Sequence, residues 1–183
     1  MATSQHISKA ARILFEGGVI AYPTEGVFGL GCIPDDAIAV TRILNIKERD
    51  PDMGLVLIVS DHAQLGDWIN LPEDACLESS AERPVTWIVP ATAEAPYWIR
   101  GRHENIAVRQ TTHPVARALC EATDSALVST SANISGRPPA RNIYLLRRQF
   151  GTLVDYIVPG VLGRAGGASE IRDLLTGKVV RPA

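Results

Sequence analysis

The stretch Ala126-Leu-Val-Ser-Thr-Ser-Ala-Asn-Ile-Ser-Gly136 joins a short apolar run to a polar loop. Residues 126–128 are typical of a buried strand, and hydroxyl and amide side chains follow at once. Such groups donate hydrogen bonds to phosphate or carboxylate oxygens without adding a full charge. Pro138-Pro139 then turns the chain away from regular structure. A plain polar turn after a strand is the alternative, and the rest of the chain decides between the two.

Outward from this stretch, apolar strands alternate with capped helices. Strands are predicted at 19–22, 55–59, 85–89, 106–108 and 154–158, with two short strands around Thr176-Gly177 in the tail 169–181. Helices are predicted to start at Ser4, at Asp35 or Asp36, at Asp61, at Pro72, at Thr112 and at Asn142. This alternation indicates the α/β class. Strands 85–89 and 106–108 lack a helix long enough for a parallel crossover, so we expect one twisted, mixed sheet flanked by helices.

Length and composition favour one globular domain over residues 1–183. The chain is 46% hydrophobic and 21% charged, with a formal net charge of -2. That charge gives no reason to expect attraction of the whole chain to nucleic acid or to an anionic membrane. The three cysteines show no metal-binding spacing, and free thiols fit a cytoplasmic protein. Neither a signal peptide nor a membrane span is indicated.

Three more segments carry groups suited to binding. Tyr22-Pro-Thr-Glu-Gly-Val-Phe-Gly-Leu-Gly-Cys32 leaves a strand with three glycines, which permit close approach to a ligand or simply make a structural turn. Lys47-Glu-Arg49 places two cations two residues apart. In an extended segment they point the same way and suit a triphosphate; the alternative is a solvated helix end. Arg109 ends an apolar strand, where it binds either a structural acid or a ligand carboxylate.

A fourth segment, Ser169-Glu-Ile-Arg-Asp173, follows a glycine pair and is followed by Arg181. No order of Ser, His and Asp supports a catalytic triad. Arginines and hydroxyls without an obvious nucleophile suggest positioning and charge neutralisation. Adenylyl and phosphoryl transfers are catalysed mainly in that way.

In this order, the motifs YPTEGVFGLGC, KER, IAVR, STSANISG and SEIRD with a closing RP resemble the YrdC/TsaC family, the L-threonylcarbamoyl-adenylate synthases. The resemblance runs from about Ser8 to Arg181 and is to the short form. It implies an α/β fold around a deep, positively lined cavity. It also implies a nucleotidyltransferase that joins L-threonine, bicarbonate and ATP into threonylcarbamoyl-AMP and pyrophosphate, with Mg²⁺ accompanying ATP. The product serves N6-threonylcarbamoyladenosine formation on tRNA, through a separate transferase and with at most a weak tRNA contact.

The resemblance also implies roles for individual residues. Lys47 and Arg49 are expected to be catalytic and to meet the ATP phosphates. The remaining ATP contacts are expected from Asn105, Ser131, Asn133 and Arg181. The threonine is expected to contact Thr24, Gly26, Arg109, Ser129 and Ser169. No protein-bound metal site is implied.

Three departures from the family pattern stand out. Met53 occupies a position where the family usually has a polar residue, often lysine. Ala81-Glu-Arg-Pro84 replaces Trp-Pro-Gly-Pro, so that Arg83 either alters this turn or restores the charge missing at Met53. Gly26 replaces a small residue. Two other functions remain open: an RNA-binding or ribosome-maturation factor, and a paralogue that binds nucleotide without turnover. The glycines of 160–167 suggest a mobile lid.

Overall fold

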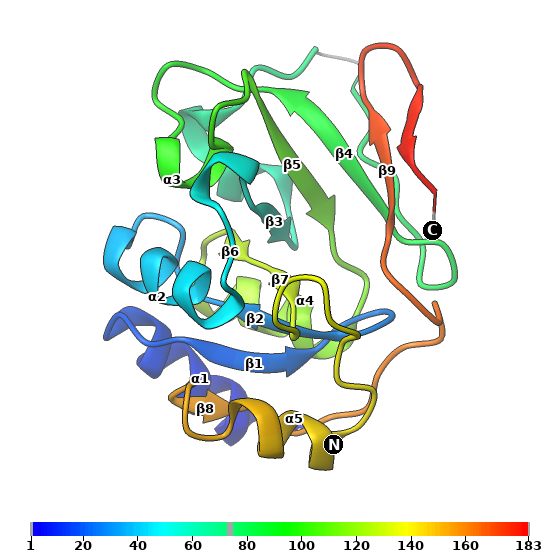
Figure 1. Cartoon of the computed structure of the whole chain (residues 1–183). Coiled ribbons are helices and arrows are strands. Elements are labelled where there is room, and N and C mark those ends of the chain that lie inside the picture. The colour runs from blue at the N-terminus through cyan, green and yellow to red at the C-terminus, as the bar shows by residue number, and fades with distance from the viewer. Residues whose placement is uncertain (1, 73–74, 183) are drawn as a thin grey trace.

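The computed structural model describes residues 2–72 and 75–182. Their strands form two mixed sheets (Figure 1). The four-stranded sheet has the order β7 (Thr130–Ser131), β2 (Phe28–Gly31), β1 (Ile20–Pro23) and β8 (Tyr156–Ile157). The six-stranded sheet has the order β10 (Val179–Arg181), β9 (Glu170–Asp173), β4 (Val85–Pro90), β5 (Asn105–Gln110), β3 (Val56–Val59) and β6 (Leu127–Val128).

The predicted α/β class and the mixed pairing are confirmed. β4 and β5 are antiparallel, as their short connection requires, whereas β3 and β5 are parallel. Two further parallel pairs join distant parts of the chain: β4 with β9, and β1 with β8, where Ile20 lies opposite Tyr156. The expectation of one sheet is wrong, because the strands are divided between two.

The polar stretch that follows residue 126 is the crossing between these sheets. β6 pairs with β3 in the larger sheet, and β7 pairs with β2 in the smaller one. The Ser129 N–H donates to the Val56 carbonyl at 2.8 Å, and three residues later the Ala132 N–H donates to the Phe28 carbonyl at 2.7 Å. The backbone of this stretch thus ties the two sheets together.

Helices begin largely at the predicted caps. They are α1 (Ser4–Phe15), α2 (Ala37–Lys47), α3 (Tyr97–Arg100), α4 (Pro114–Thr123), α5 (Ile143–Phe150) and the short 3₁₀ helices η1 (Pro51–Met53) and η2 (His62–Trp68). The Asp36 side chain accepts from two N–H groups of α2, and Asn142 accepts from one of α5. Two caps are shifted by one residue: Thr3 precedes α1 and His113 precedes α4. The helix expected from Pro72 falls partly on 73–74, outside the described residues, and 75–80 contain none.

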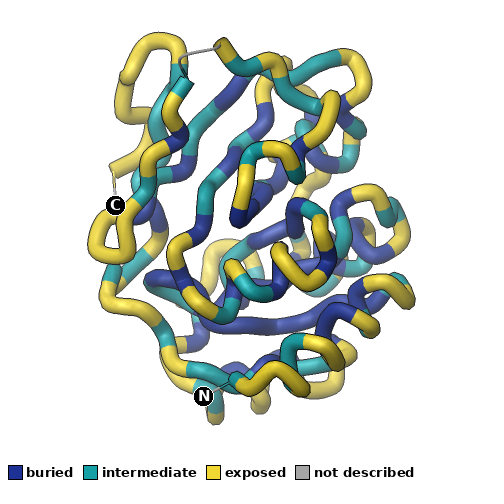
Figure 2. Tube along the Cα trace, turned by 180° about the vertical axis from the view of Figure 1, so that it is seen from behind, coloured by how far each residue is buried: buried dark blue, intermediate teal, exposed yellow. Residues whose placement is uncertain are grey.

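Alternation along the inner strands builds two apolar cores. Leu57 and Val59 of β3 belong to the core between the sheets, while Ile58 faces the second core under α1 and α4. In β1, Ala21 and Ile20 divide in the same way. The inner strands are accordingly buried, whereas loops and outer helix faces are exposed (Figure 2). No helix in the described residues is long and apolar enough to cross a membrane.

Candidate functional site

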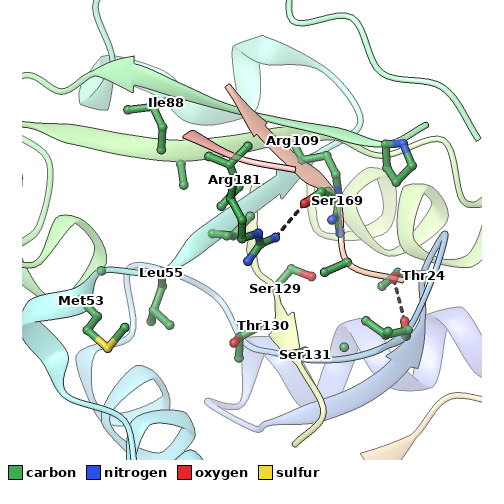
Figure 3. A pocket seen from close by; sticks show the side chains of 18 of the residues that line it. Thr24, Met53, Leu55, Ile88, Arg109, Ser129, Thr130, Ser131, Ser169 and Arg181 are labelled. Carbon is green, nitrogen blue, oxygen red and sulfur yellow. Dashed lines mark hydrogen bonds between the residues drawn. The ribbon is translucent and has the colours of Figure 1, made fainter. Parts of the chain in front are cut away.

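A cavity of about 440 Å³ lies where the two sheets meet. The smaller sheet contributes the turn between β1 and β2 together with β7; the larger contributes β5, β9 and β10. Every second residue of β5 faces the cavity, namely Asn105, Ala107 and Arg109, because alternate side chains of a strand share one face. Figure 3 shows side chains from both sheets around the same space.

Most of the predicted site residues line this cavity, although they are distant in sequence. Those that do are Thr24, Gly26, Arg49, Asn105, Arg109, Ser129, Ser131, Ser169 and Arg181. Lys47 and Asn133 are not among the lining residues. The grouping follows from the crossing at 126–131, which brings the polar loop to the turn after β1.

Lys47 is buried inside the protein instead of facing the cavity. The expected extended geometry is wrong, because α2 includes Lys47 and then ends at Glu48 in a left-handed conformation with φ of 51°. The Lys47 Nζ donates to the Asn133 carbonyl at 2.8 Å, to the Asn133 Oδ1 at 3.1 Å and to the Ser131 carbonyl. Burial, and secondarily the charge of Arg49, lower the pKa of Lys47 to about 8. Lys47 therefore holds the polar loop in place.

Arg49 lines the cavity just beyond the end of α2. Its Nη2 donates to the Gly54 carbonyl at 2.8 Å, and burial lowers the pKa of its guanidinium. Its Nε is buried without a hydrogen-bond partner in the part of the chain that the structure describes. A buried donor without a partner is costly, so a ligand oxygen at this position would be stabilised.

Arg109 is paired with the carboxylate of Glu25, at 3.6 Å between Nη2 and Oε2. The other oxygen of Glu25 accepts from the Thr111 hydroxyl at 2.7 Å and from the Thr112 N–H at 2.9 Å. Burial raises the pKa of Glu25, but Arg109 and these hydrogen bonds outweigh burial and leave the pKa lowered. The structural acid partner of Arg109 is confirmed, and because Arg109 also lines the cavity, its contact with a ligand carboxylate stays a prediction.

Ser169 connects β4 of the larger sheet with the tail of the chain. Its hydroxyl shares a hydrogen bond with that of Thr86 at 2.6 Å, and its carbonyl accepts from Arg181 Nη2 at 2.7 Å. Figure 3 shows Arg181 reaching across to Ser169, with Arg109 and Ser129 nearby. Pairing of β10 with β9 therefore brings Arg181 to the cavity, where its side chain donates to the Ser169 carbonyl just before β9.

The glycine-rich segment suggested as a lid packs on the turn after β1. The Gly163 N–H donates to the Thr24 carbonyl at 2.9 Å, and the Ala165 N–H donates to the Glu25 carbonyl at 3.0 Å. A Cβ at Gly26 would stand 1.8 Å from the Gly167 carbonyl oxygen. Only glycine fits at position 26 while these two backbones are this close.

Sequence reasoning missed several lining residues, among them Arg100 and His103. Arg100 ends the four-residue helix α3 and His103 follows it, and this helix is too short to show a periodic pattern. The only signal was the run Arg100-Gly-Arg-His103 just before the strand that ends in Arg109. Arg83 does not restore the charge absent at Met53, because Arg83 is exposed and is not among the lining residues, whereas Met53 is.

The cavity carries an excess of positive charge. Its lining includes one acid, Glu25, and four arginines: Arg49, Arg100, Arg109 and Arg181. Arg109 compensates Glu25, which leaves the charge of the other three available for an anionic ligand. In residues 2–72 and 75–182, no group of three or more His, Cys, Asp or Glu side chains is placed to hold a metal ion.

Known proteins with similar sequences cover almost the whole chain. The chain is 51% identical over 176 residues to the threonylcarbamoyl-AMP synthase of Nitrosococcus oceani, covering 94% of this chain and 95% of that protein. It is 47% identical over 180 residues to the enzyme of the same name from Cellvibrio japonicus, covering 97% and 95%.

Solved structures share the fold. Sua5 of P. abyssi in complex with L-threonine matches with a TM-score of 0.83 and 30% identity over 94% of this chain, which spans about half, 52%, of that longer chain. YciO of E. coli matches with a TM-score of 0.81 and 26% identity over 98% of this chain and 90% of the other. The model of the Sua5/YciO/YrdC family, described as "Telomere recombination", matches residues 12–183. The resemblance found in the five motifs is thereby confirmed, and the chain belongs to the Sua5/YciO/YrdC family.

Proposed function

We propose that this protein is a threonylcarbamoyl-AMP synthase, a nucleotidyltransferase that makes threonylcarbamoyl-AMP and pyrophosphate from L-threonine, bicarbonate and ATP. The observation that supports it most is the cavity itself. One end offers an arginine set among hydroxyls, and the rest offers Arg49, Arg100 and Arg181, which form no ion pair within residues 2–72 and 75–182. The first arrangement suits an amino acid and the second a polyphosphate. The names of the relatives from N. oceani and C. japonicus agree with this pairing.

At the amino-acid end, Arg109 takes the carboxylate of threonine. Its planar fork matches a carboxylate, and Glu25 fixes the orientation of the guanidinium before the substrate arrives. The hydroxyls of Ser129 and Ser169 and the backbone from Thr24 to Gly26 surround the rest of the substrate. The P. abyssi relative has been seen with L-threonine, which supports the assignment of such a site.

At the nucleotide end, Arg49 and Arg181 contact the phosphates, with Asn105 and Ser131 beside them. Lys47 acts through its three hydrogen bonds to the polar loop, and so positions Ser131 and Asn133. We retain Lys47 and Asn133 as residues required for ATP binding, in this indirect role. Mg²⁺ enters with ATP as part of the substrate, since it commonly binds through phosphates and water.

The chemistry requires positioning more than proton transfer. The amine of threonine combines with bicarbonate to form a carbamate and water. A carbamate oxygen then attacks the α-phosphorus of ATP, the bond to the β-phosphate oxygen breaks, and pyrophosphate leaves. The arginines neutralise the charge that develops on pyrophosphate.

The product feeds a tRNA modification in the cytoplasm, where a separate transferase uses it to form N6-threonylcarbamoyladenosine. Direct contact of this chain with tRNA is at most weak under this proposal. The alternative of an RNA-binding factor has less support, because the net charge is -2 and few aromatic side chains are present for base stacking.

The test is pyrophosphate release from ATP and bicarbonate, with and without L-threonine. The proposal expects release that depends on threonine, and formation of threonylcarbamoyl-AMP in the same reaction. Folded protein that binds ATP but releases no pyrophosphate with threonine would support the paralogue instead. Binding of bare tRNA without ATP, with a steep dependence on salt, would favour the RNA-binding alternative.

A further inference from the structure

Arg100 lines the cavity but belongs to none of the motifs that marked the site. It is the last residue of α3 and is partly buried. Its Nε donates to the Ala95 carbonyl at 3.3 Å and its Nη1 to the His103 carbonyl at 3.1 Å. Within the described ranges, none of the ion pairs includes Arg100. The side chain is therefore held in place by neutral carbonyls, while its positive charge is left uncompensated.

The turn that carries Arg100 packs directly on the turn that carries Met53. The Leu55 N–H donates to the Ile99 carbonyl at 2.8 Å, and the Arg102 N–H donates to the Asp52 carbonyl at 3.2 Å. The Tyr97 hydroxyl also hydrogen-bonds to Asp52. These contacts fix η1 against α3, so that Met53 and Arg100 line adjoining parts of the cavity wall.

Gly101 allows this close packing. Its φ is 62°, and a Cβ there would stand 2.3 Å from the Asp52 carbonyl oxygen. A side chain at this position would push the two turns apart. The backbones that carry Met53 and Arg100 are therefore held close together, mainly by contacts between backbone groups.

Met53 contributes a neutral side chain to the lining at these two turns, and Arg100 contributes a charged residue. The thioether of Met53 carries no charge and binds phosphate poorly. Arg100 also lines the cavity, and so does Arg49, whose Nη2 is bonded to the Gly54 carbonyl. Arg49 and Arg100 together present a cationic surface suited to successive phosphates.

We propose that Arg100 binds the polyphosphate of the nucleotide, and so supplies the positive charge that Met53 does not. This assignment rests on the proposed function, because it places ATP in the cavity. It makes Arg100 a determinant of affinity for triphosphates in this chain. Under this assignment, position 53 is neutral because the positive charge for this part of the cavity lies at position 100.

The experiment compares Arg100→Gln with Arg102→Gln, which removes an exposed arginine two residues away that does not line the cavity. Calorimetric titration with ATP and with AMP measures nucleotide binding without turnover. Loss of one charge-assisted contact is expected to weaken ATP binding roughly 10- to 100-fold in Arg100→Gln. AMP binding is expected to change less than threefold, and Arg102→Gln is expected to match the wild type.

A second set of variants places the positive charge at position 53 instead of position 100. Met53→Lys added to Arg100→Gln is expected to recover at least part of the lost ATP affinity, whereas the same lysine in the wild-type background adds less. Arg100→Lys, which keeps the charge, is expected to bind ATP within a few-fold of the wild type. It serves as the readout if thermal unfolding shows that Arg100→Gln does not fold.

The outcomes separate this inference from the proposed function. Equal ATP affinity in folded Arg100→Gln and Arg102→Gln overturns the role of Arg100, even if the wild type makes threonylcarbamoyl-AMP. The role of Arg100 is also overturned if Arg100→Lys, which keeps the charge, loses as much ATP affinity as is expected for Arg100→Gln. Conversely, Arg100-dependent ATP binding without threonine-dependent turnover supports the inference and contradicts the proposed synthase.

Discussion

Arg109 and Arg49 line the same cavity, but their guanidinium groups have different neighbours. Arg109 lies against the buried carboxylate of Glu25, which is itself held by hydrogen bonds from Thr111 and Thr112. Arg49 has a carbonyl partner, Gly54, and no acid partner among the described residues. The first arrangement fixes one arginine in one orientation, which suits a single carboxylate. The second leaves positive charge uncompensated, which suits a polyanion.

The largest effect is expected from Arg109→Gln, which tests whether the two arginines bind different substrates. The change removes the ligand for the threonine carboxylate and leaves Glu25 buried without its cation. Truncating one partner of a buried charge pair costs about 2 to 5 kcal/mol. We expect kcat/KM for threonine to fall roughly 30- to several thousand-fold, by the same principle. Steady-state kinetics with varied threonine concentration measures this kcat/KM.

Two observations control that experiment. ATP binding, measured by calorimetry, is expected to remain within a few-fold of the wild type. Arg117→Gln removes an exposed arginine of α4 that pairs with Glu121 on the surface, and is expected to leave both substrates unaffected. Equal loss of ATP and threonine binding in Arg109→Gln would contradict the separation of the two ends.

Arg49→Gln tests the other end. It removes one charge-assisted contact to phosphate, worth about 1.5 to 3 kcal/mol. We expect the KM for ATP to rise roughly 10- to 100-fold, while the dissociation constant of threonine stays unchanged. Added salt is expected to weaken ATP binding less in the variant than in the wild type. An unchanged KM for ATP would show that Arg49 does not meet the nucleotide.

Titration of Lys47 is expected to change ATP affinity less than the arginine substitutions do, and within a defined pH range. Its pKa in the folded protein is about 8, against about 10.4 in the unfolded chain. The unfolded chain therefore binds more protons between these values, and the contribution of Lys47 to stability rises with pH across that window. Deprotonation, however, leaves two N–H donors for three acceptors, so the loop from Ser131 to Asn133 loses a hydrogen bond.

We therefore expect ATP affinity to be constant from about pH 7 to 8 and to weaken above it, by up to about tenfold per pH unit. Binding of ATP is the preferred measurement, because the amine of threonine also titrates in this range. Arg49→Gln is expected to move the transition upward, since Arg49 helps to lower the pKa of Lys47. Constant affinity up to pH 9.5 would exclude this role for Lys47.

The smallest effect on substrate binding is expected at Gly26. In Gly26→Ala the new Cβ meets the Gly167 carbonyl at 1.8 Å, so the segment 163–167 has to shift. We expect unfolding by urea to show a loss of about 1 to 3 kcal/mol, with a few-fold rise in the KM for threonine. Gly167→Ala is the matched control, because a Cβ at that position meets nothing within 4 Å. A fully stable Gly26→Ala would show that the segment moves freely.

Local patterns predicted much of the fold and part of the site. The caps at Asp36 and Asn142 and the cavity position of Arg109 follow from short-range rules about helix starts and charges at strand ends. β2 was missed because Phe28-Gly-Leu-Gly31 resembles a loop, although all four residues are buried. Lys47 was misplaced because the left-handed turn at Glu48 redirects the chain, and only the three-dimensional structure shows that turn.

The division into two sheets was also beyond local patterns. It depends on one backbone that pairs with β3 through β6 and then with β2 through β7. Pairings of that kind join residues far apart in sequence, and no spacing rule within one segment specifies them. Arg100 was missed for a related reason, because it reaches the cavity only through the packing of α3 on η1.

The parallel pairing of β1 with β8 has a consequence during synthesis of the protein. Ile20 leaves the ribosome long before Tyr156, its neighbour in the sheet. At a translation rate of roughly 5 to 20 residues per second, β1 is without its partner strand β8 for on the order of 7 to 30 s. All four residues of β1 are buried in the finished fold. The nascent chain therefore exposes an unpaired, aggregation-prone strand edge throughout that interval. Conditions that slow translation between the two strands therefore lengthen the period in which unfinished chains can aggregate.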